Sequence, residues 1–342
     1  MAVIDVLAGE SINAAFTNAN PGDTIRVAAG VFEENVVIPS GLDRLRLLGS
    51  GIGETILDGT GSLGDGIVVN SSFVTIAGFK VRGYGANGIQ VNTSDNIIRD
   101  LRVQNNGDDG IDIDGADRNL IFNVKSKKNG SDGIEIDGNN NYVVECKLIE
   151  NADDGIDLIG ANNLFLKNKA NGNGNTGIEV SGSGTLIIDN DVKNNAGGVF
   201  VLTNENFILD NRVNRSSSLD AIFLDGVENN LFFNNTVKNN NGDGIDVNGG
   251  DFNRVIGNKV KANSFTGIEL DNNSNQNIVD LNLVKKNAAP GIFLTSDAND
   301  NAVRENFLRK NIPDIQADDP ADDNNIFDEN DCQTSSPPGI CS

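Results

Sequence analysis

One ten-residue phrase recurs along most of the chain and constrains its fold more than any other feature. NGDDGIDIDG, NGSDGIEIDG and NADDGIDLIG begin at Asn106, Asn129 and Asn151, 23 and 22 residues apart. Each copy ends a polar turn with Gly-Ile and then alternates acidic and apolar residues, which is the period of a strand with one buried face. A phrase that returns at this interval predicts one coil of a solenoid per copy.

The repeat predicts which side chains point inward. Ile111 and Ile113 should be buried, whereas Asp112 and Asp114 should face outward. The glycine before the strand recurs, with one alanine among its positions, at Gly66, Gly88, Gly110, Gly133, Gly155, Gly177, Gly198, Ala221, Gly244, Gly267 and Gly291. Stacked coils of this kind should build continuous aliphatic rows in one narrow core.

Two columns of asparagine mark the turns of the coils. Asparagine tolerates the left-handed turn conformation and can bond to the asparagine of the next coil, which predicts amide ladders. The columns are Asn96, Asn119, Asn141, Asn163, Asn206, Asn230, Asn253, Asn277 and Asn301, and Asn106, Asn129, Asn151, Asn173, Asn194, Asn240, Asn263 and Asn287. With three short strand runs per coil, they predict an all-β chain: a single right-handed parallel β-helix of about a dozen coils. The LxxLxL pattern and helical segment of a leucine-rich horseshoe are missing.

The two ends differ in texture from the repeats. Residues 1–60 should form an N-terminal cap and irregular first coils, with a short helix that Ser11 caps and that ends before Asn20-Pro21-Gly22. Residues 61–315 carry the regular repeats. Residues 316–342 are acidic and interrupted by proline, which predicts a closing segment.

Composition excludes several functions. With 49 Asp+Glu against 26 Lys+Arg the formal net charge is −23, so nucleic acid is not an expected partner. No apolar run approaches the roughly 20 residues that span a bilayer, so membrane insertion is not expected either. The chain has no histidine, the commonest general base and transition-metal ligand. No organic cofactor is expected, because an aromatic-lined pocket would need more than the two Tyr and no Trp present.

The three cysteines point in two directions. Cys332 and Cys341 bracket a Pro-Pro-Gly loop that a disulfide would close, which favours an oxidising compartment. Cys146 lies in an alternating segment and is expected either to pack as a small hydrophobe or to be an exposed thiol. The sequence begins MAVIDVLAGESINAAF and shows no signal-peptide pattern.

The chain resembles the pectin-lyase-like superfamily of right-handed parallel β-helices. The resemblance rests on NPGDTIRVAAGVFEENVVI near the N-terminus and on the repeated "N-x-I-x-x-N … G-I-x-I" coils, which are similar to those of NosD-like proteins. It implies a polysaccharide-binding or polysaccharide-processing protein, and an extracellular or cell-surface location. NosD-like proteins would instead imply a maturation role.

A pair of motifs one coil apart resembles those of polygalacturonase. Ser131-Asp132-Gly133 and Asp153-Asp154-Gly155 look like its N-T-D and D-D motifs, while Asn175-Thr176-Gly177 stands where that family has G-H-G. The resemblance implies a glycoside hydrolase or polysaccharide lyase. Its implied catalytic residues are Asp132 as general acid, and Asp154 with Asp153 or Asp157 activating water.

The outward acidic columns suggest a cation site. Neighbouring coils lie about 4.8 Å apart, so carboxylates on successive coils form a grid of oxygen ligands that suits Ca²⁺. The expected ligands are Asp109, Asp112, Asp132, Glu135, Asp154 and Asp157. The competing interpretation is that these groups only keep an exposed sheet face wet and soluble.

Aromatic residues interrupt the carboxylate column further along the chain. Phe200 and Phe223, beside Glu179 and Asp246, are candidate substrate-binding residues, because two aromatics on successive coils suit a sugar ring. An ordinary hydrophobic ladder would show the same pattern. The leading hypothesis is a β-helix that binds or processes a glycan, and the alternative is a non-catalytic surface, scaffold or maturation protein.

Overall fold

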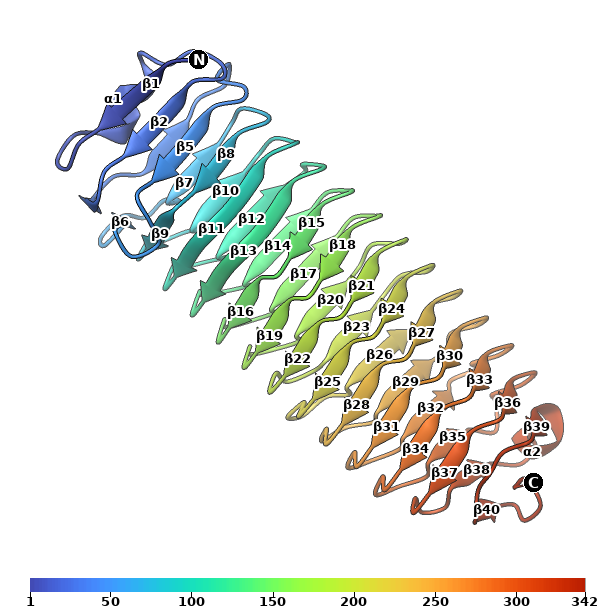
Figure 1. Ribbon diagram of the computed structural model, residues 1–342. Helices are drawn as coiled ribbons and strands as arrows, with labels where there is room; N and C mark the ends of the chain where they lie inside the picture. The colour runs from blue at the N-terminus through green and yellow to red at the C-terminus, as the bar shows by residue number, and fades with distance from the viewer. Residues whose placement is uncertain (342) are drawn as a thin grey trace. The chain divides into compact units, whose positions relative to one another are not determined.

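The computed structural model describes residues 1–341 and forms two compact units, residues 1–174 and the residues from Asn175 onward. In each unit the chain winds in coils of short parallel strands (Figure 1). The predicted parallel β-helix is confirmed. It has about 15 turns instead of about a dozen, because residues outside the regular repeats also form strands.

One strand of each coil follows the repeat glycine or takes the equivalent place, and these are here called the GI strands. Within each unit they stack in parallel, so that Ile111 lies opposite Ile134, and Ile134 opposite Ile156. In the first unit they are β4 (Val36–Ile38), β7 (Ile67–Val69), β10 (Ile89–Val91), β12 (Ile111–Asp114), β14 (Ile134–Asp137) and β17 (Ile156–Ile159). In the second unit they are β20 (Ile178–Val180), β23 (Val199–Val201), β26 (Ile222–Asp225), β29 (Ile245–Asn248), β32 (Ile268–Asp271), β35 (Ile292–Leu294), β38 (Ile315–Ala317) and β40 (Ser335–Ser336).

The other strands are here called the paired strands, and they form the second sheet. Each coil usually contributes two consecutive strands to it, joined by a bend. In the first unit they are β1 (Val3–Val6), β2 (Thr24–Val27), β3 (Gly30–Phe32), β5 (Arg46–Gly49), β6 (Thr55–Asp58), β8 (Thr75–Ala77), β9 (Phe79–Arg82), β11 (Ile97–Gln104), β13 (Leu120–Lys127), β15 (Tyr142–Val144), β16 (Lys147–Ile149), β18 (Leu164–Leu166) and β19 (Lys169–Asn171). In the second unit they are β21 (Leu186–Ile188), β22 (Asp191–Lys193), β24 (Phe207–Leu209), β25 (Arg212–Asn214), β27 (Leu231–Phe233), β28 (Thr236–Lys238), β30 (Arg254–Ile256), β31 (Lys259–Lys261), β33 (Ile278–Asp280), β34 (Leu283–Lys285), β36 (Ala302–Arg304), β37 (Phe307–Arg309) and β39 (Ile326–Asp328).

The aliphatic rows form the core as predicted. Ile111 and Ile113 are fully buried, while Asp112 is partly exposed and Asp114 exposed. The glycine before each strand has a packing reason, because the coils approach closely there. A Cβ on Gly133 would lie 2.5 Å from the carbonyl oxygen of Gly155, closer than real Cβ atoms come. Glycine therefore permits the spacing that stacks the GI strands.

Asparagine ladders join the coils, and there are three columns where the sequence predicted two. In the first column the backbone N–H of Asn119 donates to Oδ1 of Asn141 at 2.8 Å. In the second, both the backbone N–H and Nδ2 of Asn129 donate to Oδ1 of Asn151. The third column lies between the paired strands and includes Asn211, Asn235, Asn258, Asn282 and Asn306.

One of the two reasons given for the first column was wrong, because the predicted bonds between asparagines of neighbouring coils form but the left-handed conformation lies elsewhere. Its asparagines are not the left-handed residues; the residue before each one is, as at Arg118 (φ 56°) before Asn119 and at Asn140 (φ 57°) before Asn141. The ladder asparagines are buried, and the side-chain oxygen of each accepts a hydrogen bond from a main-chain N–H of the preceding coil. They are therefore selected by hydrogen bonding across coils rather than by turn conformation.

The N-terminal cap forms as the sequence predicts. Helix α1 (Ile12–Phe16) begins after Ser11, whose hydroxyl oxygen accepts the N–H of Ala14 at 3.2 Å. Ile12 and Phe16 are buried, and the helix contacts β1 and β4. Figure 1 shows α1 beside β1, close to the N-terminus. The cap thus covers apolar side chains at the beginning of the first unit.

The C-terminal residues contribute a helix and further strands. Helix α2 (Ala321–Asn324) precedes β39, which pairs with β36, and β40 pairs with β38. Cys332 and Cys341 are joined by a disulfide, and Cys146 is buried with a free thiol. Cys146 takes a place in the third ladder column, where its N–H donates to Oδ1 of Asn168. In the described residues no helix combines the length and apolarity needed to cross a bilayer.

Candidate functional site

The outward column of the GI strands gathers carboxylates in the first unit. Asp112, Glu135 and Asp157 occupy equivalent positions on β12, β14 and β17, and adjacent members face each other in register. All three side chains are partly exposed. Alternation along each strand places them on the outer face, opposite the buried isoleucines. This column is open to solvent and to a ligand.

The column before the glycine corrects the expectation of an outward, wet row. Asp109, Asp132 and Asp154 are only 4%, 6% and 4% exposed. Their carboxylates form a ladder, because Oδ1 of Asp109 accepts the N–H of Asp132 at 2.7 Å, and Oδ1 of Asp132 accepts that of Asp154 at 2.6 Å. Asn87 and Thr176 hold the same place in other coils, and these neutral acceptors were the signal that sequence reasoning missed.

Five of the six predicted metal ligands fall into two groups instead of one grid. Carboxylate oxygens of Asp109, Asp112 and Glu135 lie within 4.8 Å of one another, and so do those of Asp132, Asp153 and Asp154. Asp153, which was assigned only a catalytic role, joins the second group and is exposed. Asp157 belongs to neither group. We call these the first and second acidic clusters.

Burial makes ionisation of several of these carboxyl groups costly. Burial and, after it, the charge of nearby Asp109 raise the pKa of Asp132 to about 8 and that of Asp112 to about 6. Burial, followed by a hydrogen bond with Asp109, also raises the pKa of Glu135. The pKa of Asp157 is raised by burial and then by the charge of Asp153. Such groups either hold protons at neutral pH or need a cation.

A third acidic cluster lies in the second unit and was not predicted as a metal site. Carboxylate oxygens of Asp220, Asp243 and Asp246 lie within 4.8 Å of one another. Burial and, after it, the charge of Asp271 raise the pKa of Asp246 to about 9. Among the described residues, Oδ1 of Asp243, of Asp246 and of Asp271 has no hydrogen-bond partner. The DGID phrase at Asp243 repeats that at Asp109, and this signal would have identified the cluster.

The predicted aromatic pair is assembled in the second unit. Phe200 on β23 and Phe223 on β26 face each other in register, with ring centroids 5.2 Å apart and planes tilted by 54°. Glu179 and Asp246 take the adjacent positions of the same column. Both rings are partly exposed, so this short aromatic strip is accessible from outside.

Arginines lie on the paired strands or their turns, away from the GI strands, as the sequence indicated. Arg82 on β9 pairs with Asp58, and Arg304 on β36 pairs with Asp280. Basic side chains therefore do not neutralise the outward carboxylate column of β12, β14 and β17.

The coils, their ladders and their acidic column define a right-handed parallel β-helix of the pectin-lyase-like class. A family model described as "Pel9A-like, right handed beta helix region" matches residues 7–185, and a second, "Right handed beta helix region", matches residues 168–308. The chain belongs to the Pel9A-like right-handed β-helix family. No curated protein matches the sequence.

Solved structures share the fold at low sequence identity. The A-module of mannuronan C-5 epimerase AlgE6 from Azotobacter vinelandii superposes with a TM-score of 0.67 at 14% identity, over 93% of this chain and 90% of that chain. The A-module of AlgE4 from the same organism gives 0.60 at 15% identity, over 95% and 92%. The Dettilon tailspike protein gives 0.63 at 14% identity, over 90% and 64%. At these identities the similarity is one of fold.

Proposed function

We propose that this chain is a polysaccharide-processing β-helix protein whose acidic clusters in the first unit bind Ca²⁺ and, with it, an acidic glycan. The observation that carries the proposal is the convergence of three carboxylates in each cluster, together with the burial that raises the pKa of Asp112 in the first and of Asp132 in the second. A fold that only needs solubility has no reason to collect charges where ionisation is costly.

The donor set fits Ca²⁺. Calcium takes 6 to 8 oxygen ligands at about 2.3–2.6 Å, so two ligands on one ion stand up to about 5 Å apart. The ligand atoms of each cluster lie within 4.8 Å of one another. All are carboxylate oxygens, and the chain has no histidine and one Met, which disfavours transition metals. Waters or glycan oxygens would complete the coordination.

The residues of the second cluster divide their roles by exposure. Asp132 and Asp154 are buried and would bind the ion on its protein side. Asp153 is exposed and Asp157 partly exposed, so they would face the glycan. Burial disfavours Asp132 as the general acid, because a sugar oxygen cannot reach a carboxyl that is 6% exposed. If the protein is catalytic, Asp153 and Asp157 are the carboxylates positioned to act on substrate. Bound Ca²⁺ would supply positive charge to the carboxylate of the glycan.

An acidic glycan is favoured over a neutral one by this arrangement. Bare carboxylate clusters repel a polyanion, but an ion held by them attracts one. The epimerase modules with the same fold act, by their names, on mannuronan, which is a polymer of a sugar acid. Phe200 and Phe223, with Glu179 and Asp246, remain the candidate sugar platform in the second unit.

The alternative is a non-catalytic surface, scaffold or maturation protein that uses the clusters for cations alone. Its supporting observation is that Asp109 and Asp132 already serve as structural acceptors in a ladder. A glycan screen separates the two functions. Pectic, alginate and neutral polysaccharides, with Ca²⁺ or chelator, are assayed for new reducing ends and for absorbance of unsaturated products.

Point variants assign any turnover to the second cluster. Asp153→Asn and Asp157→Asn should each lower turnover at least tenfold, whereas Asp137→Asn, an exposed carboxylate of β14 outside the clusters, should not. Glycan binding without turnover would support the binding function only. If no glycan is bound or cleaved in Ca²⁺, the polysaccharide proposal is abandoned for the scaffold alternative.

A further inference from the structure

A groove on the paired strands of the second unit combines apolar, amide and guanidinium side chains. It encloses about 280 Å³ over β24, β27, β30 and β33. Its floor is one outward column, Phe207, Leu231, Arg254 and Ile278, whose members follow one another in register. Adjacent side chains of the floor therefore stand about 4.8 Å apart.

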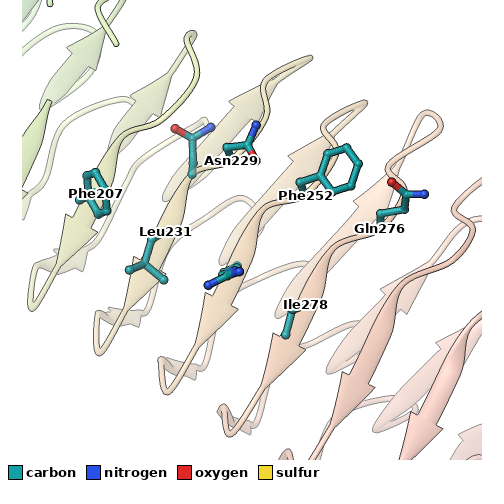
Figure 2. A pocket seen from close by; sticks show the side chains of 8 residues that line it. Phe207, Asn229, Leu231, Phe252, Gln276 and Ile278 are labelled. Carbon is teal, nitrogen blue, oxygen red and sulfur yellow. The ribbon is translucent and has the colours of Figure 1, made fainter. Parts of the chain in front are cut away.

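The rim of the groove comes from one turn position repeated on three coils. Asn229, Phe252 and Gln276 each stand two residues before a floor residue, and each has a left-handed backbone, with φ of 60°, 56° and 56°. Figure 2 shows these three side chains as a row above Phe207, Leu231 and Ile278. The groove thus has an apolar base interrupted by Arg254, and a rim with one aromatic ring and two side-chain amides.

Arg254 is the only charged side chain that lines this groove. Its register neighbours, Leu231 and Ile278, are apolar. Arg304 is placed differently, because its register neighbour Asp280 forms an ion pair with it at 2.7 Å. Within residues 1–341, the Arg254 side chain has no ion pair or hydrogen bond. An exposed guanidinium without a counter-ion, in a chain of net charge −23, provides a place for an external anion.

These features select one class of ligand. Aromatic and aliphatic side chains cover the C–H faces of a sugar ring, and amides bond its hydroxyls. A guanidinium forms paired hydrogen bonds with a carboxylate. We propose that this groove binds a hexuronate residue of an acidic polysaccharide, with Arg254 on the carboxylate and with Phe207 and Phe252 against the ring. The inference rests on the proposed function for its ligand class, and it adds a second site that needs no metal.

Chelator separates this site from the acidic clusters. Binding of tri-galacturonate and tri-mannuronate is measured by titration calorimetry in EDTA at 150 mM salt, where calcium-dependent binding is absent. At least one of the two should bind the wild type, and the neutral trisaccharides galactotriose and mannotriose should bind at least tenfold more weakly. Arg254→Gln should weaken uronate binding at least tenfold. Phe252→Asn, which keeps a residue tolerant of positive φ, should weaken it several-fold.

Arg212→Gln is the matched control, because Arg212 is an exposed arginine of β25 in the same unit that does not line the groove. It should bind like the wild type, and melting temperatures should match for all variants. The inference is overturned if neither uronate binds in EDTA, if Arg254→Gln binds like the wild type, or if Arg212→Gln is equally impaired. Self-association that Arg254→Gln abolishes would assign the groove to a second copy and also overturn it. Absence of both calcium-dependent glycan binding and calcium-dependent turnover, with EDTA-resistant uronate binding intact, would refute the proposed function and leave this inference standing.

Discussion

The ladder carboxylates of the GI sheet perform a structural task that a neutral residue also performs. Oδ1 of Asn87 accepts the N–H of Asp109 at 3.0 Å, just as Oδ1 of Asp109 accepts that of Asp132 at 2.7 Å. The hydrogen bond therefore requires an acceptor but not a charge. Three buried aspartates in successive coils add a repulsive cost that the fold does not need. A bound cation would offset this repulsion, so the buried aspartates favour a cation site.

Asp132→Asn should stabilise the metal-free protein at alkaline pH. An unfolded aspartate has a pKa of about 3.9, whereas burial raises that of Asp132 to about 8. The folded state therefore disfavours the carboxylate, and stability falls as pH rises from about 4 toward 8. Asparagine keeps the acceptor for Asp154 and removes the charge. In EDTA at pH 8 the variant should exceed the wild type by at least about 1 kcal/mol, with little difference at pH 4.

Thermal melts from pH 4 to pH 9 in EDTA measure this difference. Asp137→Asn is the control, because Asp137 is exposed and lies outside the clusters. Wild type and Asp132→Asn with parallel pH profiles would contradict a buried, uncompensated charge at position 132.

Strands of three or four residues depend for their stability on the hydrogen bonds between neighbouring coils. Each GI strand is too short to be stable alone, so its register depends on the strands beside it and on the ladders at its ends. The third ladder shows this in the second unit. Asn211 donates both its N–H and its Nδ2 to Oδ1 of Asn235, and Nδ2 of Asn235 donates to the carbonyl of Ile208.

Asn235→Ala should destabilise the protein strongly. It leaves two buried donors of Asn211 without their acceptor, at roughly 1–3 kcal/mol for each orphaned group. Asn241→Ala removes an exposed asparagine whose Nδ2 bonds only to the carbonyl of Ser217, and it should cost less than about 0.5 kcal/mol. Denaturant unfolding of the two variants provides the comparison. Equal midpoints would show that the ladder does not hold the coils.

The repeat allowed the strands and their buried faces to be predicted from the sequence. The candidate site was harder to predict, because its burial depends on contacts with the next coil. Alternation alone placed Ile111 inward and Asp112 outward. It could not show that Asp109 and Asp132 are buried and accept a main-chain N–H of the following coil, because that depends on how turns of 22 and 23 residues stack. The third ladder could have been aligned from the sequence, because its asparagines are the second Asn of the repeated N-x-I-x-x-N phrase. The Arg254 groove could not, since the register neighbours of Arg254 are 23 and 24 residues away.

Across the whole molecule, acidic side chains gather in groups in both units. The formal net charge is −23, and among the described residues the first unit contains two groups, and the second unit one group, of three carboxylates whose oxygens lie within 4.8 Å of one another. A divalent ion bound to the folded state and not to the unfolded chain stabilises by mass action. Metal binding, glycan recognition at the acidic clusters and stability should therefore respond together to Ca²⁺.

Titration of Ca²⁺ into the chelator-treated protein, followed by calorimetry at fixed ionic strength, measures whether the acidic clusters bind the ion. The wild type should show saturable binding. Asp153→Asn should lose the site formed with Asp132 and Asp154, seen as a loss of stoichiometry or a fall of at least tenfold in affinity, and Asp137→Asn should match the wild type. Absence of saturable binding by the wild type would contradict Ca²⁺ binding by the acidic clusters. An Asp153→Asn isotherm that superposes on the wild-type isotherm would likewise contradict the site formed with Asp132 and Asp154.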